Sequence, residues 1–227
     1  DHDIDFTAGN FNFDDGSGQA VVTALTKQID ASWVAGDAAG GLDTGSVAAD
    51  TTYHCFAIYD PTTSTEDFLF STSLLSPTLP SGYTKKKRVG SIITDSSSNI
   101  INFLYRGGGR FDISGTGQIV DYSSSVAVDQ SGISVGLSVP AGMIARILVK
   151  SRGNNASPVI VAATDQTNTT ADSATDTTAP IGNLGDQSNS ATDVAYGNLE
   201  IQTDASSSIK FGTGNFGAIP PSGSTIE

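Results

Sequence analysis

The stretch "YHCFAIY", Tyr53 to Tyr59, predicts a β-strand with two apolar faces. Its odd-numbered positions carry Tyr, Cys, Ala and Tyr, and its even-numbered positions carry His, Phe and Ile. Successive side chains of a strand point to opposite faces, so neither face of this one is polar throughout. We therefore expect a central strand that is buried on both sides.

Short segments of similar character recur along the chain, separated by turn residues. They predict strands at 53–59, 88–94, 100–106, 133–139, 144–150 and 158–163. "KRVGSIIT" and "NIINFLYR" flank "DSSS", which predicts a β-hairpin over about residues 87–106. No amphipathic pattern exceeds two helical turns. We expect an all-β fold, an antiparallel β-sandwich or jelly-roll with few or no helices.

Composition limits the possible partners. The chain has 227 residues and a formal net charge of −13, with 24 Asp and Glu against 11 Lys and Arg. Such a surface repels polyanions, so we expect no nucleic-acid binding. The single cysteine, Cys55, excludes an internal disulfide, and no apolar run is long enough for membrane insertion. The chain begins with Asp1, and we expect it to be part of a longer protein.

One segment differs from the strand pattern. Residues 164–193 are rich in Thr, Asp, Asn and Ser and nearly free of large apolar side chains, which predicts a long exposed loop. The strands predicted on either side are alike, and we find no internal repeat. We therefore expect a single β domain over residues 1–227.

Motifs for catalysis or cofactor binding fail on their context. "GTGNFG" is followed by two prolines, which forbid the helix that a dinucleotide needs, and "GISVG" lies inside a predicted strand. His2, His54 and Cys55 have the wrong spacing for a metal, and His54 is better explained as a core residue. Acid pairs such as Asp14 with Asp15 are typical of turns. We predict no enzyme, no cofactor, no metal and no catalytic residue.

A basic run, Lys85, Lys86, Lys87 and Arg88, contrasts with the acidic chain. It follows a Pro-Gly turn and leads into a strand, so its side chains alternate between two faces and form no single cationic surface. Lysines at such a place protect a sheet edge or cover apolar neighbours. The next alternative is a contact with acids of a neighbouring subunit, which makes these four residues candidates for a subunit interface.

Residues 20–112 resemble the C-terminal modules of bacteriophage and prophage tail-fibre or appendage proteins. A Trp-x-x-Gly and Gly-Gly-Leu-Asp-x-Gly segment precedes a Tyr-His strand, and a Pro-x-Leu-Pro-x-Gly-Tyr turn leads to a basic residue. The matching residues are Trp33, Gly36, Gly40, Gly41, Leu42, Asp43, Gly45, Tyr53, His54, Pro77, Leu79, Pro80, Gly82, Tyr83, Arg88 and Gly90. The added lysines and the end "GAIPPSGSTIE" depart from this pattern.

The resemblance implies a structural protein of the virion surface that acts in host attachment. Such proteins resemble trimeric appendages, so the implied partners are further copies of the chain, other virion proteins and a host cell-surface glycan. Aromatic faces and polar loop side chains recognise glycans, which makes Trp33, Tyr83 and Arg110 the candidate ligand-binding residues. For Trp33, the only tryptophan, a structural anchor is an equal alternative.

Two alternatives belong to other classes of function. A purely architectural virion protein, such as a capsid decoration or a tail connector, would need interfaces and no ligand. A polysaccharide depolymerase would need two carboxylates at a defined separation, and the sequence does not supply that geometry.

Overall fold

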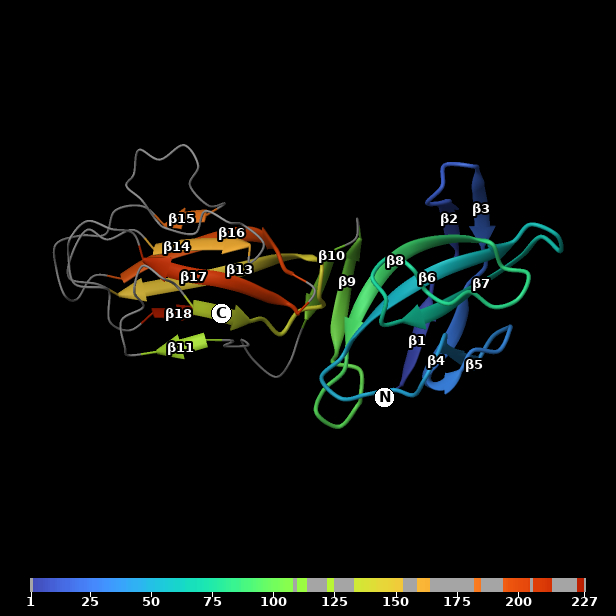
Figure 1. Cartoon of the computed structure of the whole chain (residues 1–227), viewed down its shortest axis with the longest axis horizontal. Helices are drawn as coiled ribbons and strands as arrows, with labels where there is room; N and C mark the ends of the chain where they lie inside the picture. Colours follow the sequence, from blue (N-terminus) through green and yellow to red (C-terminus); the bar gives the residue numbers. More distant parts are fainter. Residues whose placement is uncertain are drawn as a thin grey trace. The chain divides into compact units, whose positions relative to one another are not determined.

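The computed structural model describes residues 2–107, 110–113, 122–124, 133–152, 159–163, 182–184, 194–204, 206–213 and 224–226. The chain divides into two compact units, unit 1 (Asp1–Ser114) and unit 2 (Gly115–Glu227) (Figure 1). The sequence had predicted one domain, since similar short strands lie on both sides of this boundary. Every regular element of the described residues is a strand, which confirms the all-β prediction. The described part contains no helix that could span a membrane.

Unit 1 is organised around a six-stranded sheet in the order β1-β4-β5-β7-β6-β8. Its strands are β1 (Asp3–Phe6), β4 (Leu25–Ser32), β5 (Ala39–Leu42), β6 (Thr52–Asp60), β7 (Thr65–Ser71) and β8 (Lys85–Ile93). β5 runs parallel to both β4 and β7, so the sheet is mixed where an antiparallel one was predicted. Glycine allows this close approach, because a Cβ on Gly40 would lie 2.1 Å from the Ser32 carbonyl oxygen.

Two hairpins complete the described part of unit 1. β2 (Gly9–Asn12) pairs with β3 (Gln19–Val22), and β9 (Phe103–Gly107) pairs with β10 (Arg110–Ile113). The apolar side of the β2–β3 hairpin packs on the main sheet, where Phe11 and Phe13 contact the cluster that contains Ala57 and Phe68.

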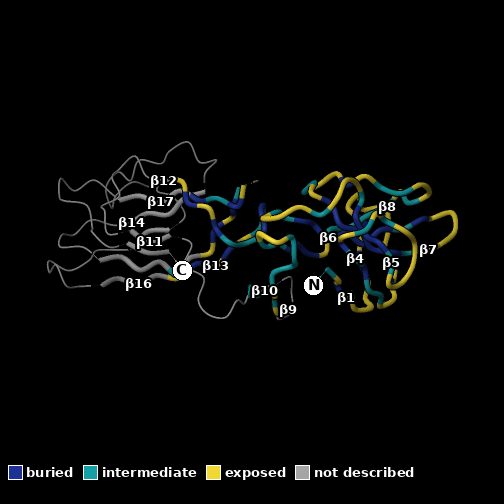
Figure 2. The backbone as a smooth tube through the Cα atoms, turned by 90° about the horizontal axis from the view of Figure 1, so that it is seen from below, coloured by how far each residue is buried: buried dark blue, intermediate teal, exposed yellow. Residues whose placement is uncertain are grey.

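The prediction of a central strand at 53–59 is confirmed by β6. It lies between β7 and β8, and its residues from Tyr53 to Ile58 are all buried (Figure 2). On one face Tyr53 and Cys55 join a core cluster with Phe70. On the other face Phe56 and Ile58 form a second cluster. A nearly continuous apolar sequence is what a strand with two covered faces requires.

The hairpin predicted over residues 87–106 is wrong in its pairing. β8 pairs along its length with β6, and β9 pairs with β10. Only a single bridge, Thr94 to Ile100, and a hydrogen bond from the Ile101 amide to the Ile93 carbonyl connect the two predicted arms. The turn between the arms exists, but beyond it the described residues form no second ladder on β8, which ends the order of the six-stranded sheet.

Unit 2 contains two four-stranded antiparallel sheets, β11-β18-β13-β16 and β12-β17-β14-β15. Their strands are β11 (Tyr122–Ser124), β12 (Ile133–Gly136), β13 (Ile144–Arg152), β14 (Val159–Ala163), β15 (Gly182–Leu184), β16 (Val194–Gln202), β17 (Ser208–Thr213) and β18 (Ser224–Ile226). The pairing is nested: first strand with last, second with seventh, third with sixth and fourth with fifth. Two further pairs, β13–β18 and β14–β17, join these ladders into sheets.

Both sheets contribute buried apolar side chains to unit 2. Val135 and Ile209 come from one sheet, and Ile147 and Ile201 come from the other. Ile144 is 71% exposed, although Ile147 of the same strand is buried. Residues three apart in a strand face opposite ways, and Ala145 takes the buried position instead.

The polar segment 164–193 is interrupted by a strand. β15 lies within it and pairs with β14, with Val159 opposite Leu184. The prediction of one continuous loop is therefore wrong at residues 182–184. The remainder of that segment lies outside the described residues.

Candidate functional site

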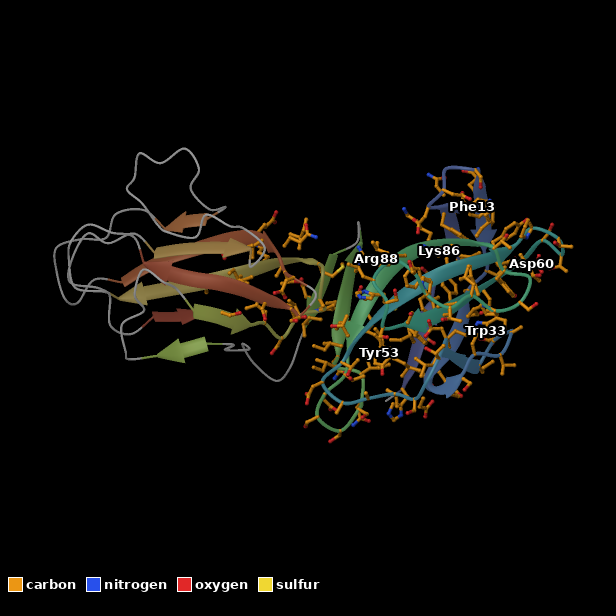
Figure 3. All side chains as sticks on the ribbon, viewed as in Figure 1. Phe13, Trp33, Tyr53, Asp60, Lys86 and Arg88 are labelled. Atoms are coloured by element: carbon orange, nitrogen blue, oxygen red, sulfur yellow. The ribbon has the colours of Figure 1, made fainter. Side chains whose placement is uncertain are left out.

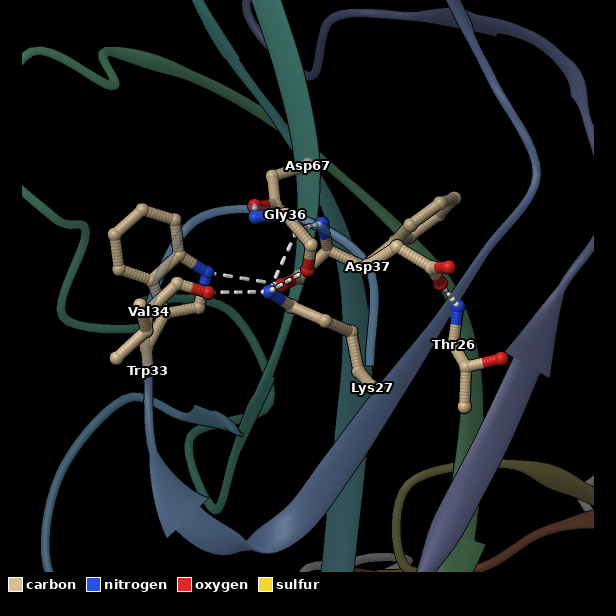
Figure 4. A network of polar contacts seen from close by, with 8 residues as sticks. Thr26, Lys27, Trp33, Val34, Gly36, Asp37 and Asp67 are labelled. Atoms are coloured by element: carbon tan, nitrogen blue, oxygen red, sulfur yellow. Dashed lines mark hydrogen bonds and ion pairs between the residues drawn. The ribbon is translucent and has the colours of Figure 1, made fainter. Parts of the chain in front are cut away.

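The polar centre of unit 1 is a buried ion pair between Lys27 and Asp67. The Lys27 Nζ lies 3.0 Å from the Asp67 Oδ1, and the two side chains are 0% and 1% exposed. Lys27 also donates to the carbonyl oxygens of Val34 and Gly36, at 2.6 and 3.1 Å (Figure 4). Asp67 accepts from the amides of Gly36 and Phe68, at 2.9 and 2.6 Å. All three ammonium protons and both carboxylate oxygens therefore have partners, as burial of two charges requires.

This pair fixes the loop that follows β4. The backbone of Val34 and Gly36 is bound by the two charged side chains, and the Thr26 amide donates to Asp37 at 2.7 Å. Sequence analysis did not single out Lys27 or Asp67. The sequence did contain a signal. Lys27 lies two positions before Ile29 in the strand, so the two side chains point to the same, buried face.

Trp33 and Tyr83, two predicted ligand-binding residues, lie in contact. Their ring centroids are 5.3 Å apart in an edge-to-face arrangement, and both side chains are half-buried. The Trp33 indole N–H donates to the Phe68 carbonyl at 3.0 Å, and the Lys27 ammonium lies over the Trp33 ring. These contacts occupy one ring face and the only polar atom of Trp33, as the alternative of a structural anchor requires.

Tyr83 belongs to a segment that covers one face of β6. We call residues 72–84 the strap. Leu79 and Tyr83 of the strap pack with Trp33 against the cluster of Phe56, Ile58 and Leu69. Burial, followed by the negative charge of Asp67, raises the pKa of Tyr83. The strap thus supplies the cover that makes β6 buried on its second face.

Residues of the tail-fibre resemblance mostly serve this framework. The Asp43 carboxylate accepts from the Thr78 amide at 2.9 Å and so ties the strap to the end of β5. The Tyr53 hydroxyl accepts from the Ala48 amide at 2.8 Å. Gly82 has a φ of +90°, and a Cβ there would lie 2.6 Å from an Asp60 carboxylate oxygen. In this molecule these residues therefore fasten loops to a sheet.

The three lysines of the basic run form ion pairs within the chain, with two aspartates in the turn of the β2–β3 hairpin. Lys85 pairs with Asp15 at 2.7 Å, and Lys86 and Lys87 both pair with Asp14, at 3.3 and 3.1 Å. Figure 3 shows Lys86 on β8 close to the hairpin that carries Phe13. The hydrogen bond with Lys85 holds the pKa of the Asp15 carboxyl well below its usual range. The prediction that these residues contact another subunit remains untested.

The same turn protects a sheet edge. β8 ends the order of the six-stranded sheet, and the Asp14 amide donates to its Lys86 carbonyl at 3.0 Å. The predicted role of the lysines at an edge strand therefore fits their position, but the alternation does not separate their charges as predicted, because all three ammonium groups reach Asp14 or Asp15. Lys85 lies over the Phe13 ring, and Lys86 lies over the Phe56 ring.

Arg88 differs from the lysines because it has no ion pair among the described residues. Its Nη1 atom is buried without a hydrogen-bond partner. The neighbouring His54 is 3% exposed, as predicted for a core residue, and its Nδ1 lies 2.8 Å from the Ser91 hydroxyl. Burial, with a contribution from the charge of Arg88, lowers the pKa of His54 to about 4. At neutral pH this histidine is therefore uncharged.

The remaining candidates supply no reactive group. Arg110 begins β10, where its backbone lies opposite Gly107, and its side chain lies outside what the structure describes. Burial raises the pKa of the Cys55 thiol to about 12, which disfavours the nucleophilic thiolate. The described residues contain no group of three His, Cys, Asp or Glu side chains that could hold a metal.

No protein-family model matches the chain, and comparisons with curated proteins and with solved structures give no significant match.

Proposed function

We propose that the chain is a structural surface protein of a virus particle, a tail fibre, spike or appendage, and that it attaches the particle to a host cell by binding a surface glycan. It would act at the surface of the extracellular particle, as a homotrimer joined to other virion proteins. Catalysis plays no part in this proposal.

The nested strand pairing of unit 2 carries the proposal. Eight strands paired first with last, inward to fourth with fifth, have the order expected of one long hairpin wound into two sheets, and on this ground we propose that unit 2 is a jelly roll. Double-sheet jelly rolls occur in viral capsid and lectin domains. A fold alone does not define a function, so this observation supports the class of protein and not a particular ligand.

Unit 1 supports the same class through the tail-fibre resemblance. The residues that carry it fasten the strap and the loop after Trp33, through the Asp43 carboxylate and the Gly36 amide. The half-exposed Trp33–Tyr83 pair borders this framework and offers an aromatic edge to a sugar. Three such chains would present three copies of a weak site, and repeated sites raise avidity for a repeated surface polymer.

A glycan array probed with the full chain tests the proposal. We expect retention on one class of bacterial surface glycan, with little loss when the salt concentration is raised, because the lysines already have acidic partners within the chain. Light scattering on the same sample should give the mass of a trimer. Absence of glycan retention by a trimer would favour an architectural virion protein, and release of reducing sugars would identify a depolymerase.

A further inference from the structure

A short sequence occurs once in each unit at the end of a long strand. Residues 92–100 read "IITDSSSNI" and residues 201–209 read "IQTDASSSI". Six of these nine positions are identical, since Ile, Thr, Asp, Ser, Ser and Ile recur in the same order. The first copy follows from β8 and the second from β16. Two short polar segments can be alike by chance, so the geometry must decide.

The strand pairs that precede the two copies have the same register next to the corner. β6 begins at Thr52, which lies opposite Ile93, the last residue of β8. β13 begins at Ile144, which lies opposite Gln202, the last residue of β16. The next pair along is buried in both cases, Tyr53 with Ile92 and Ala145 with Ile201. The threonine of the repeated sequence directly follows the last residue of β8 or β16.

That threonine makes the same hydrogen bonds in both units. The Thr94 hydroxyl accepts from the Thr51 amide at 3.0 Å, and the Thr203 hydroxyl accepts from the Met143 amide at 3.3 Å. The Thr94 amide donates to the Thr51 carbonyl, and the Thr203 amide donates to the Met143 carbonyl, at 3.0 and 2.9 Å. Both threonines are buried, at 1% and 3% exposure.

The aspartate that follows closes the turn in the same way. Asp95 Oδ1 accepts from the amides two and four residues ahead, at 2.8 and 2.9 Å. Asp204 Oδ1 accepts from the equivalent amides, both at 2.8 Å. The carbonyls of Asp95 and Asp204 accept from the amides of Asp50 and Gly142, at 3.1 and 3.0 Å.

The backbone conformation agrees at the positions that ordinary residues avoid. Ser98 and Ser207 have φ values of 65° and 55°, and the facing turns place Asp50 and Gly142 at 48° and 66°. Positive φ is found for only a few per cent of non-glycine residues. Its recurrence at matched positions, together with matched register and hydrogen bonds, makes a chance likeness a poor explanation.

We infer that both units are built on one repeated module, in which a pair of long antiparallel strands is closed by a Thr-Asp corner, and that Thr94 and Thr203 are its positioning residues. The module comprises β6, β8 and the turns at 48–51 and 94–100 in unit 1. In unit 2 it comprises β13, β16 and the turns at 140–143 and 203–209. The surrounding strands differ, so each unit carries its own loops on the same frame. This inference does not depend on the proposed function.

Amide hydrogen exchange on the full chain tests the inference. Thr94→Val should speed exchange of the Thr51 amide, and Thr203→Val that of the Met143 amide, each by about 5- to 100-fold, because a buried donor loses its acceptor. Thr94→Ser and Thr203→Ser keep the hydroxyl, so the Thr51 and Met143 amides should exchange slowly in these variants. This comparison remains informative if the valine variants unfold. Thr7→Val, at an exposed position, is the control.

A second experiment exchanges the two corners. Ser96→Ala with Asn99→Ser gives the first corner the sequence of the second, and Ala205→Ser with Ser208→Asn does the reverse. If the corners are equivalent, both exchanged chains should keep slow exchange at Thr51 and Met143. The inference is overturned if either exchanged chain unfolds, or if only one of the two threonines protects its amide.

Discussion

The β6–β8 pair of unit 1 and the β13–β16 pair of unit 2 have the same register at the corner but differ on their second face. His54, beside the buried Tyr53, is covered, whereas Arg146, beside the buried Ala145, is exposed. The difference lies in what covers the strands, since Trp33 and the strap pack on β6. A strand pair can therefore keep one backbone while its neighbours decide whether its second face is apolar or polar.

The largest expected effect on the free energy of unfolding comes from breaking the buried Lys27–Asp67 pair, which holds the loop after Trp33. Lys27→Met leaves the Asp67 carboxylate buried without its counter-charge, which should lower the free energy of unfolding by about 3–5 kcal/mol. Urea titration followed by Trp33 fluorescence measures it, because the single tryptophan reports on unit 1. Lys85→Met removes a partly exposed pair and should cost less than about 1 kcal/mol. Equal losses in the two variants would show that burial of the pair is unimportant.

A matched substitution compares the two strands directly. Ile58→Ala removes a side chain that is 0% exposed and should cost about 2–5 kcal/mol. Ile144→Ala removes one that is 71% exposed and should change the stability by less than about 0.5 kcal/mol. Thermal unfolding of both variants measures the difference. A similar cost at both positions would contradict the proposed contrast between the covered and the open face.

The two-faced character of β6 was predictable from sequence, and its covering was not. "YHCFAIY" has apolar residues at both its odd-numbered and its even-numbered positions, so the local pattern predicts a central strand. The partners of β8 and the parallel contacts of β5 depend on residues far apart in the chain, which periodicity does not report. Lys27 and Asp67 lie 40 positions apart, and each alone reads as an ordinary polar residue.

The candidate site shows the same limit. Trp33 and Tyr83 were predicted as ligand-binding residues, but only the fold reveals that they touch and that the indole N–H is already bonded. The convergence of the three lysines on Asp14 and Asp15 was not predictable from the local pattern, because these acids lie about seventy residues away. The likeness of the two corners can be seen in the sequence, but it is too short to establish a repeat without the matched hydrogen bonds.

The covered face should also make unit 1 sensitive to mild acid. The pKa of His54 is lowered from 6.5 to about 4, so the unfolded chain binds its proton first as the pH falls. The contribution of His54 to the free energy of unfolding is therefore fully present above about pH 6.5 and declines toward pH 4. Between pH 7 and pH 5.5 the free energy of unfolding should fall by about 1 kcal/mol. Urea titrations at those two pH values measure the loss. His54→Gln should remove most of it, and an unchanged loss in that variant would assign the pH dependence to other groups.

The smallest expected effect concerns the basic run. Replacing Lys85, Lys86 and Lys87 together by Gln removes three partly exposed ion pairs, each of which contributes less than about 1 kcal/mol. The fold and the oligomer should persist, and the difference from the unaltered chain should shrink as salt is added. Urea titration over a salt series measures this. If instead the triple variant keeps its oligomer and loses host-cell binding in a salt-sensitive way, the run is a receptor site.

Competition for adsorption tests the proposed function most directly. Host cells are first saturated with the purified chain, and the fraction of virus particles that then adsorb is counted. If the chain carries the attachment site, adsorption should fall in proportion to the sites occupied, and unfolded chain should have no effect. Unchanged adsorption with saturating folded trimer would contradict attachment and leave an architectural role in the particle.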